Sequence, residues 1–569
     1  MADKFIRVNI GSKKITLEER KDLELYGGRG LIDKILNDEV DPNCDAMGPG
    51  NKLIICVGLL NGTAAPASGR ISVGCKSPLT GGVKEANVGG TAGAAFARLG
   101  LKAIIVENAP AGDAWYILKV TKDGAELVPG NKYAGLGTYA AAAKLMEEYG
   151  SKISVMTIGP AGERGYKNST VQVTDPSGHT ARAAGRGGVG AVMGSKRIKA
   201  IVLDTEGTKL EAAYVDKEKF MEANRKFIEG IKGHPISGGG YPAMGTAAGV
   251  LGVNALGALP TKNFSDGRFD KAENISGETL AKNAKERGGR TGHACQTGCI
   301  IRCSNVYHGP DGKYLTSGLE YETIGLVGSN CLISNLDTVA AIDRMCDDFG
   351  LDTMETGATI GVVMESGKIA WGDDEAAIKL VQEIGEGTEF GTVLGNGTLA
   401  TGQYLGVKRI PVAKGQGFAA YDPRSLKGTG VTYATAPQGA DHTCGNSLGT
   451  VGEIDPYNKA GQVELSTNLQ VVFCMMDCTG MCLFNSFCTV DEQYLMAVVK
   501  MFEGKFGGEW TVDRLMGLAV EAIALEKKFN ESAGVPKVDV PEFIRTEVVP
   551  SSGAVFDLTD EELSQAIPF

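Results

Sequence analysis

Cysteines gather at two places that lie far apart in this chain. One string, GHACQTGCIIRCSN, contains Cys295, Cys299 and Cys303, and a second, FCMMDCTGMC, contains Cys474, Cys478 and Cys482. Thiolates grouped in this way suit an iron–sulfur cubane, which takes four cysteine sulfurs as ligands. The pattern therefore predicts a redox cluster held by three local cysteines and one remote cysteine.

The spacing of the first group, C-x3-C-x3-C, restricts its backbone. A straight α-helix would place Cys295 and Cys303 about 12 Å apart, which is too far for one compact cluster. We therefore expect the segment to bend, and Gly298 offers the backbone freedom to do so. The remaining cysteines are expected to be small buried hydrophobic residues, namely Cys44, Cys56, Cys75, Cys331, Cys346, Cys444 and Cys488.

Length and composition limit the class of protein. A chain of 569 residues implies several domains, and its longest apolar runs, such as LIICVGLL, are too short to cross a membrane. The first residues, MADKFIRVNIGSKK, lack the apolar core of a secretory signal, so we expect reduced thiols in the cytoplasm. A net charge of −11 without a concentrated Lys/Arg face argues against a nucleic-acid surface.

Glycine is enriched, with 80 residues in the whole chain, and glycines crowd at 26–31, 77–93 and 184–194. Such clusters either form tight turns in a β-rich region or let backbone amides approach a phosphate-bearing ligand. Gly185, Gly187 and Gly190 match G-x-G-x-x-G, but that fingerprint needs a strand before it and a helix after it. Because TDPSGHTARAA precedes the match and the strand-like KAIVLD follows it, we expect no dinucleotide site.

The same glycine-rich stretch is not a P-loop, since it ends in Gly194-Ser195-Lys196 rather than Gly-Lys-Ser/Thr. Arginine is the side chain suited to bidentate contact with phosphate. Arg182 and Arg186 are therefore predicted to grip a different phosphorylated cofactor.

The apolar pattern divides the chain into regions of different periodicity. Up to residue 207, β-like runs alternate with glycine turns: FIRVNI, KITLEE, KLIICVG, KAIIVEN, WYILKVT, ISVMTIG and KAIVLDT. Helical periodicity follows in VDKEKFMEANRKFIEGIKG, NLDTVAAIDRMCDDFG, DEAAIKLVQEIGEG and DEQYLMAVVKMFEGKFG. This predicts an α+β protein with a β-rich N-terminal base domain at 1–207 and two mostly helical domains at 208–412 and 413–569.

Several strings occur in the order found in one family. They are GGRGL, SGRISVGCKSPLTGGVKEANVGG, ARAAGRGGVGAVMGSKRIKAI, GLEYETIGLVGSN, DDFGLDT, DPRSLKGTGVTYATAPQGADH and DCTGMCLF. Across most of its length the chain resembles the tungsten-containing aldehyde ferredoxin oxidoreductases. The resemblance implies a tungsten (or molybdenum) bis-pterin centre beside one [4Fe-4S] cluster, on a β base with two helical domains.

The resemblance also assigns cofactor-binding residues. The two pterin motifs of the family fall on Asp347, Gly350, Leu351 and Asp352, and on Asp477, Gly480, Met481 and Cys482, where Met replaces the usual Leu. A magnesium ion bridging the pterin phosphates is implied at the backbone carbonyls of Asn87 and Ala183. The residues implied to line the same cleft are Arg70, Gly89, Gly90, Arg182, Gly185 and Arg186.

The cluster ligands implied by the resemblance are Cys295, Cys299, Cys303 and Cys482. The family commonly has C-x2-C-x3-C, so the extra residue here leaves the middle ligand open, and Cys478 or Cys474 remains an alternative to Cys482. For acid–base chemistry, the resemblance points to Glu322, with Tyr321 beside it, and to His442. Glu320 is a competitor for the role of Glu322. His293 is expected to act as a hydrogen-bond partner near the cluster.

We therefore expect an enzyme that oxidises an aldehyde to a carboxylic acid and passes electrons through the cluster to ferredoxin or a small iron–sulfur partner subunit. We also expect a homo- or hetero-oligomer. Because relatives in this family act on other substrates, other reactions stay open for this chain. They are the reverse reduction of a carboxylic acid and action on a hydroxycarboxylate, a sugar-phosphate aldehyde or an aromatic thioester. Two rival functions remain. One is a radical S-adenosylmethionine enzyme, but its C-x3-C-x2-C motif and its barrel of βα units do not match the cysteine spacing and element order of this chain. The other is a non-catalytic electron-relay subunit.

Overall fold

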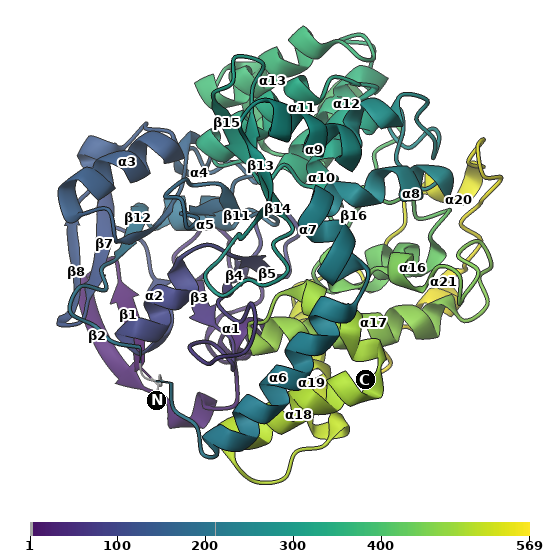
Figure 1. Ribbon diagram of the computed structural model, residues 1–569. Helices are drawn as coiled ribbons and strands as arrows, with labels where there is room; N and C mark the ends of the chain where they lie inside the picture. Colours follow the sequence, from purple (N-terminus) through teal and green to yellow (C-terminus); the bar gives the residue numbers. More distant parts are fainter. Residues whose placement is uncertain (1–3, 211) are drawn as a thin grey trace.

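The computed structural model describes residues 4–210 and 212–569. Its N-terminal part contains two six-stranded mixed sheets (Figure 1). The first sheet has the order β2-β1-β6-β3-β4-β5, formed by Lys14–Glu19, Lys4–Asn9, Leu101–Glu107, Leu53–Val57, Ile71–Lys76 and Val83–Val88. The second has the order β8-β7-β12-β9-β10-β11, formed by Gly124–Pro129, Tyr116–Thr121, Ile198–Leu203, Ser154–Thr157, Val171–Val173 and Arg182–Ala184.

The two sheets repeat one topology. In each, the first two strands form an antiparallel hairpin and the first strand pairs in parallel with the sixth. The third strand then pairs antiparallel with the sixth and the fourth, and the fourth with the fifth. The N-terminal part is therefore a structural duplication, with β1–β6 as the first repeat and β7–β12 as the second.

Helices occupy equivalent places in the two repeats. Helix α1 (Gly28–Glu39) and helix α3 (Thr138–Tyr149) each connect the second strand to the third, and each packs on the outer face of its sheet. Helix α2 (Ala92–Leu99) and helix α5 (Val189–Ser195) each precede the sixth strand. The inner faces of both sheets share one apolar core that includes Ile55, Val73 and Ile201.

The strand predictions are confirmed, because all seven β-like runs lie on β1, β2, β3, β6, β7, β9 and β12. The expected local structure around Gly185 is wrong in one respect. A strand, β11, does precede Gly185, and a short helix, α5, does begin at Val189. However, β11 is an antiparallel edge strand paired with β10, which is not the parallel βαβ arrangement that the fingerprint requires.

The rest of the chain is mostly helical. The predicted periodic segments form α6 (Lys217–Gly233), α11 (Leu336–Phe349), α13 (Asp374–Glu386) and α18 (Glu492–Phe506). Each begins after a residue whose side chain accepts a backbone N–H of the first turn, namely Asp216, Asn335, Asp373 and Asp491. Helices α12 (Thr353–Glu365), α17 (Gln462–Thr479) and α19 (Val512–Ser532) join them around one large core.

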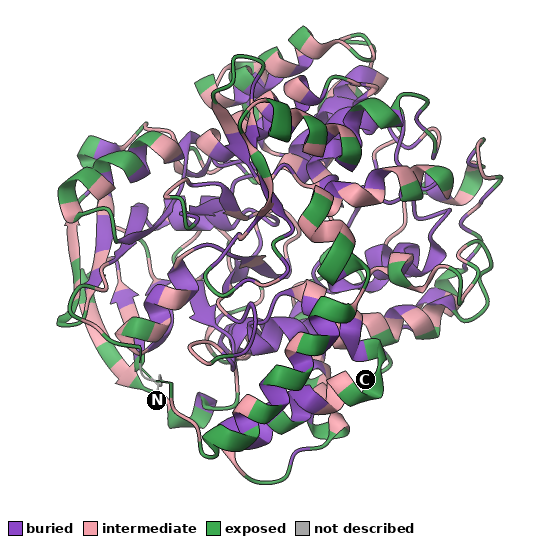
Figure 2. Ribbon diagram, in the orientation of Figure 1, coloured by how far each residue is buried: buried purple, intermediate pink, exposed green. Residues whose placement is uncertain are grey.

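Burial follows this layering. Figure 2 shows the inner strands of both sheets buried, whereas the edge strands β2 and β8 and the outward faces of the helices carry the exposed residues. Within the described residues, no helix combines the length and apolar character needed to cross a bilayer. The predicted α+β class, with a β-sheet base followed by helical regions, is confirmed.

Candidate functional site

Cys295, Cys299 and Cys303 lie in the loop between β13 (Arg290–His293) and β14 (Ser304–His308). The loop is not helical, and Gly298 adopts a left-handed φ of 79°, so the predicted bend is present at the predicted residue. All three cysteines are buried. The thiols of Cys295 and Cys299 are hydrogen-bonded, which raises the pKa of Cys295 and lowers that of Cys299.

The structure brings Cys482 to this loop. The backbone N–H of Cys482 donates to the carbonyl of Ala67, whose own N–H donates to the carbonyl of Gly298. Burial is the main cause that raises the pKa of Cys482, and the nearby Cys295 thiolate also raises it. Cys474 lies elsewhere, with its thiol against the carbonyl of Ala519 in α19. Cys478 packs against α1, since a Cβ built on Gly30 would lie 3.2 Å from its sulfur. Of the three downstream cysteines, the geometry favours Cys482 as the fourth member.

No three His, Cys, Asp or Glu side chains among residues 4–210 and 212–569 converge closely enough to hold a single metal ion. A cubane is larger than one ion and attaches each thiolate to a different iron. Four buried cysteines around one loop therefore fit a cluster better than a mononuclear site.

Both predicted pterin motifs have the same backbone form. Helices α11 and α17 each end at a glycine in the left-handed conformation, with φ of 73° at Gly350 and 76° at Gly480. The next residue, Leu351 or Met481, is buried. The structure therefore presents two equivalent loops, and the replacement of Leu by Met leaves the second loop intact.

Each loop docks on a different repeat of the N-terminal part. The carbonyl of Gly350 accepts from the N–H of Thr170, just before β10, and the carbonyl of Gly480 accepts from the N–H of Arg70, just before β4. β4 and β10 occupy the same place in the two repeats. The duplication of the β base thus provides two equivalent supports for two equivalent loops.

The aspartates of the two motifs are buried in the last turns of these helices. Burial is the largest cause that raises the pKa of Asp347, followed by the neighbouring carboxylate of Asp343. Burial also raises the pKa of Asp477, whose carboxylate lies 3.6 Å from the guanidinium of Arg29. Arg29 was missed by the sequence argument, although it belongs to the GGRGL string.

The predicted arginines of the cleft differ in their surroundings. Arg70 bonds to the side chain and the carbonyl of Asn87. Arg182 donates to Ser304 at 2.8 Å and lies 3.6 Å from Glu320, while its buried Nε has no partner. Gly89 lies next to both Arg70 and Cys295, since a Cβ built there would come within 3.5 Å of each. These contacts place Arg70 and Arg182 beside the cysteine loop.

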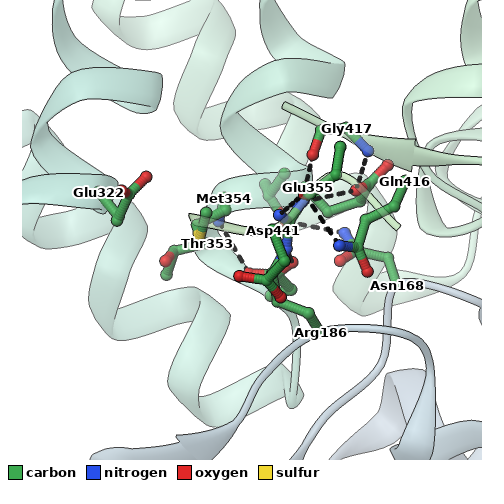
Figure 3. A network of polar contacts seen from close by, with 12 residues as sticks. Asn168, Arg186, Glu322, Thr353, Met354, Glu355, Gln416, Gly417 and Asp441 are labelled. Carbon is green, nitrogen blue, oxygen red and sulfur yellow. Dashed lines mark hydrogen bonds and ion pairs between the residues drawn. The ribbon is translucent and has the colours of Figure 1, made fainter. Parts of the chain in front are cut away.

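Arg186 is the centre of a protein-internal network (Figure 3). Its guanidinium contacts the carboxylates of Asp352 at 3.2 Å and Glu355 at 3.3 Å. It also donates to the carbonyls of Gly417 and Ala440, both at 2.6 Å. Arg186 therefore ties the first pterin motif to the segment that carries His442, and its phosphate contact stays a prediction.

Glu322 and His442 face one another. The Nε2 of His442 lies 3.4 Å from Oε1 of Glu322, and the other carboxylate oxygen, Oε2, accepts from the N–H of Ala420 at 2.7 Å. Burial raises the pKa of Glu322, while His442, the next largest influence, lowers it. Oε1 of Glu322 and Nδ1 of His442 are buried without a hydrogen-bond partner, so both groups keep capacity for a ligand.

The neighbours of this pair have other contacts. The hydroxyl of Tyr321 donates to the carbonyl of Ala420 at 2.6 Å, so Tyr321 supports the segment that holds Glu322. Glu320, the competitor, accepts from Thr246 and lies with Arg182 rather than with His442. His293 lies 3.3 Å from Asp175. The structure thus distinguishes Glu322 from Glu320 by its histidine partner.

Comparison with known proteins identifies the family of this chain. The family model for the N-terminal domain of aldehyde ferredoxin oxidoreductase matches residues 5–205, and the model for its domains 2 and 3 matches residues 222–567. The chain belongs to the aldehyde ferredoxin oxidoreductase family. Tungsten-containing aldehyde ferredoxin oxidoreductases of Pyrococcus furiosus and Thermococcus kodakarensis are 34% and 33% identical to it, each over 94% of this chain and 89% of the relative.

Other similarities are more distant. The WOR-like subunit of an aliphatic sulfonate oxidoreductase of Pyrococcus furiosus is 27% identical over 78% of this chain and 75% of the relative. Among solved structures, the active site complex BamBC of benzoyl coenzyme A reductase superposes with a TM-score of 0.79 at 18% identity, covering 99% of this chain and 92% of that one. The superposition shows a shared fold.

Membership of the aldehyde ferredoxin oxidoreductase family makes the chain an oxidoreductase and implies a tungsten–pterin cofactor. The described residues fit such a group. Two buried carboxylates, Asp347 and Asp477, end equivalent helices, and carboxylates suit ring N–H donors. The buried Nε of Arg182 has no protein partner, as expected of a donor that awaits an anionic ligand.

Proposed function

We propose that this protein oxidises an aldehyde and water to a carboxylic acid at a tungsten (or molybdenum) bis-pterin centre. Each turnover converts R–CHO and H2O into R–COOH with release of two electrons and two protons. The observation that carries the proposal is the facing pair of Glu322 and His442, 3.4 Å apart, in a chain of this family. The bound tungsten–pterin group would supply the acceptor for the two electrons.

Glu322 is proposed to take a proton from the attacking water. A general base works best with a pKa near the operating pH, and burial moves the pKa of Glu322 upward from its usual value. The N–H of Ala420 holds one carboxylate oxygen, which leaves the other directed at His442. His442 would stabilise the negative charge of Glu322 between turnovers and fix its direction.

The cofactor would be held by both halves of the duplicated base. Asp347 and Asp477 would each accept an N–H donor of one pterin through one carboxyl oxygen, while Arg70 and Arg182 would face the phosphates. The proposal includes a magnesium ion that binds the pterin phosphates at the backbone carbonyls of Asn87 and Ala183. These two residues lie at equivalent places on β5 and β11, which supports a single ion shared between the repeats.

Electrons are proposed to leave through a [4Fe-4S] cluster on Cys295, Cys299, Cys303 and Cys482. Gly89 adjoins both the cysteine loop and the cleft, since a Cβ built there would lie 3.4 Å from the sulfur of Cys295 and 3.5 Å from the guanidinium of Arg70. The acceptor would be ferredoxin or a small iron–sulfur partner subunit. This part of the proposal rests on the four buried cysteines and on the family.

The experiment uses protein expressed without oxygen in medium containing both tungstate and molybdate. We expect iron and tungsten in the purified holoenzyme and viologen reduction that depends on an aldehyde, measured with a panel of aliphatic, aromatic and phosphorylated aldehydes together with acids and aromatic thioesters. Glu322→Gln should abolish turnover, whereas the control variant Glu375→Gln, at an exposed glutamate in the first turn of α13, should retain it. Protein that carries iron but neither tungsten nor molybdenum would contradict the proposal.

A further inference from the structure

Two buried carboxylates lie side by side on helix α11 near the candidate site. Asp343 and Asp347 are one turn apart and therefore project from the same face, with exposures of only 4% and 7%. Neither carboxylate makes an ion pair within 4 Å with a described Lys, Arg or His. Two acids buried in this way cannot both ionise without a large cost in free energy. The pair therefore holds a proton at neutral pH.

Hydroxyl groups connect Asp343 to the candidate site. Thr316 donates to one carboxylate oxygen at 2.6 Å and Thr323 to the other at 3.5 Å. The hydroxyl of Thr323 also bonds to that of Thr353 at 2.8 Å. Thr323 directly follows Glu322 in the chain, and Thr353 directly follows Asp352 of the first pterin motif. Thr353 lies on the side of the Arg186 network that faces Glu322 (Figure 3).

A second set of hydroxyls connects Asp347 to the surface. Tyr139 donates to Asp347 at 3.4 Å, and its hydroxyl lies 3.3 Å from that of Tyr314. The ring of Tyr314 stacks on His179 with centroids 4.1 Å apart. Tyr139, Tyr314 and His179 are all partly exposed, so this group reaches solvent from the opposite end of the acid pair.

We propose that Asp343 and Asp347 form a proton relay that carries protons released at the candidate site to the half-exposed Tyr139–Tyr314 pair. The inference rests on the proposed function, because aldehyde oxidation releases two protons beside Glu322 and His442, whose side chains are only 13% and 20% exposed. In each step an oxygen takes up one proton as it releases another, so that no charge accumulates. A proton from the candidate site is taken up through the hydroxyls of Thr353 and Thr323, and Thr323 hands its own proton to Asp343. Asp343 then protonates Asp347, and Asp347 releases its proton through the tyrosine hydroxyls to solvent. The electrons leave separately through the cofactor.

The groups that face the acid pair suit this role. Arg182 and Glu320 face Asp343, with Arg182 favouring its ionised form and Glu320 opposing it, and Cys346 lies beside it on α11. Arg182 and Arg344 face Asp347. Burial, the largest influence, raises the pKa of Asp343 to about 7. A carboxyl with a pKa near 7 both accepts and releases protons at neutral pH.

The test compares holoenzyme variants with equal tungsten and iron content. Asp343→Asn removes the titratable group but keeps the shape, Asp343→Glu restores it, and Tyr139→Phe removes the outlet hydroxyl. Asp311→Asn alters an exposed aspartate in a turn and serves as the control. We expect Asp343→Asn and Tyr139→Phe to slow both viologen reduction and dye-detected proton release at least tenfold, with a larger solvent isotope effect, and we expect Asp343→Glu to recover most of the rate.

The infrared spectrum of the purified protein gives a second measurement that needs no turnover. A protonated carboxyl band should titrate near pH 7 in the wild type and be absent in Asp343→Asn. Loaded Asp343→Asn and Tyr139→Phe enzymes with wild-type rates and isotope effects would overturn the relay and leave the proposed function in place. A loaded wild type that oxidises no aldehyde would refute the proposed function, and absence of the infrared band would independently refute the relay.

Discussion

Gly58 lies where the first repeat of the β base meets the second pterin loop, and its replacement by alanine tests whether that contact holds the site together. A Cβ built on Gly58 would lie 2.0 Å from the nitrogen and 2.3 Å from the Cα of Gly480. Real Cβ atoms do not approach backbone so closely, so the loop must move. The equivalent change at Gly159 would place a Cβ 2.2 Å from the carbonyl oxygen of Phe349.

The cost can be worked out from the bonds that the movement breaks. The N–H groups of Leu59, Leu60 and Arg70 donate to the carbonyls of Cys478, Thr479 and Gly480. Each such bond contributes about 1 kcal/mol, and overpacking adds about 1–3 kcal/mol. Gly58→Ala should therefore destabilise the contact by about 4–6 kcal/mol. The displaced loop carries Asp477 and leads to Cys482, so tungsten and iron content should fall with it.

The assay is thermal unfolding followed by circular dichroism, with metal analysis of the same samples. Gly517→Ala is the matched control, because Gly517 lies inside α19 with no atom within 4 Å of the built Cβ. An alanine in a helix interior is favoured over glycine by about 1 kcal/mol, so this variant should unfold at the wild-type temperature or above it. A Gly58→Ala protein with wild-type melting and full metal content would refute the reasoning.

Three further predictions follow from the site. Cys482→Ser should lower the iron content and the visible absorbance of the purified protein, whereas Cys474→Ser should leave both unchanged, since Cys474 packs against α19. His442→Ala should lower aldehyde turnover by about 10–100-fold, because Glu322 loses the partner that orients it, with tungsten retained, as checked by metal analysis and viologen kinetics. Burial raises the pKa of Asp343 from 3.8 to about 7. Between these two pH values the folded state therefore binds one proton more than the unfolded state. Stability should therefore fall as pH rises from about 4 to about 7, by on the order of 4 kcal/mol, and Asp343→Asn should flatten this dependence in melting curves.

The features that sequence could predict are those set by short segments. Alternating apolar runs such as KLIICVG and periodic runs such as NLDTVAAIDRMCDDFG specify a buried strand and an amphipathic helix without reference to the rest of the chain. Asp347 and Gly350 could be placed together for the same reason, because a helix that ends at a left-handed glycine is a local arrangement. The bend at Gly298 followed from the size of a cluster and the pitch of a helix.

Contacts between distant segments could not be predicted in this way. Glu322 is brought to His442 by packing of two parts of the chain, and nothing local to EYET distinguishes Glu322 from Glu320. The relation between β1–β6 and β7–β12 was also missed, because strand order and pairing repeat while the residues do not. Asp343 carries no motif, and its chemical interest arises only from its burial beside Asp347.

The duplication explains why the proposed metal centre would draw on so much of the chain. One repeat receives the loop after α17 at Gly58, and the other receives the loop after α11 at Gly159, so neither half of the base can form a complete site alone. The two loops also differ where the cofactor must be asymmetric. The residue that follows the glycine and its apolar neighbour is Cys482 in one loop, beside the cysteine cluster, and Asp352 in the other, paired with Arg186. The symmetric support thus presents a thiol in one loop, which the proposed function uses for electron transfer, and in the other loop a buried carboxylate that fixes Arg186.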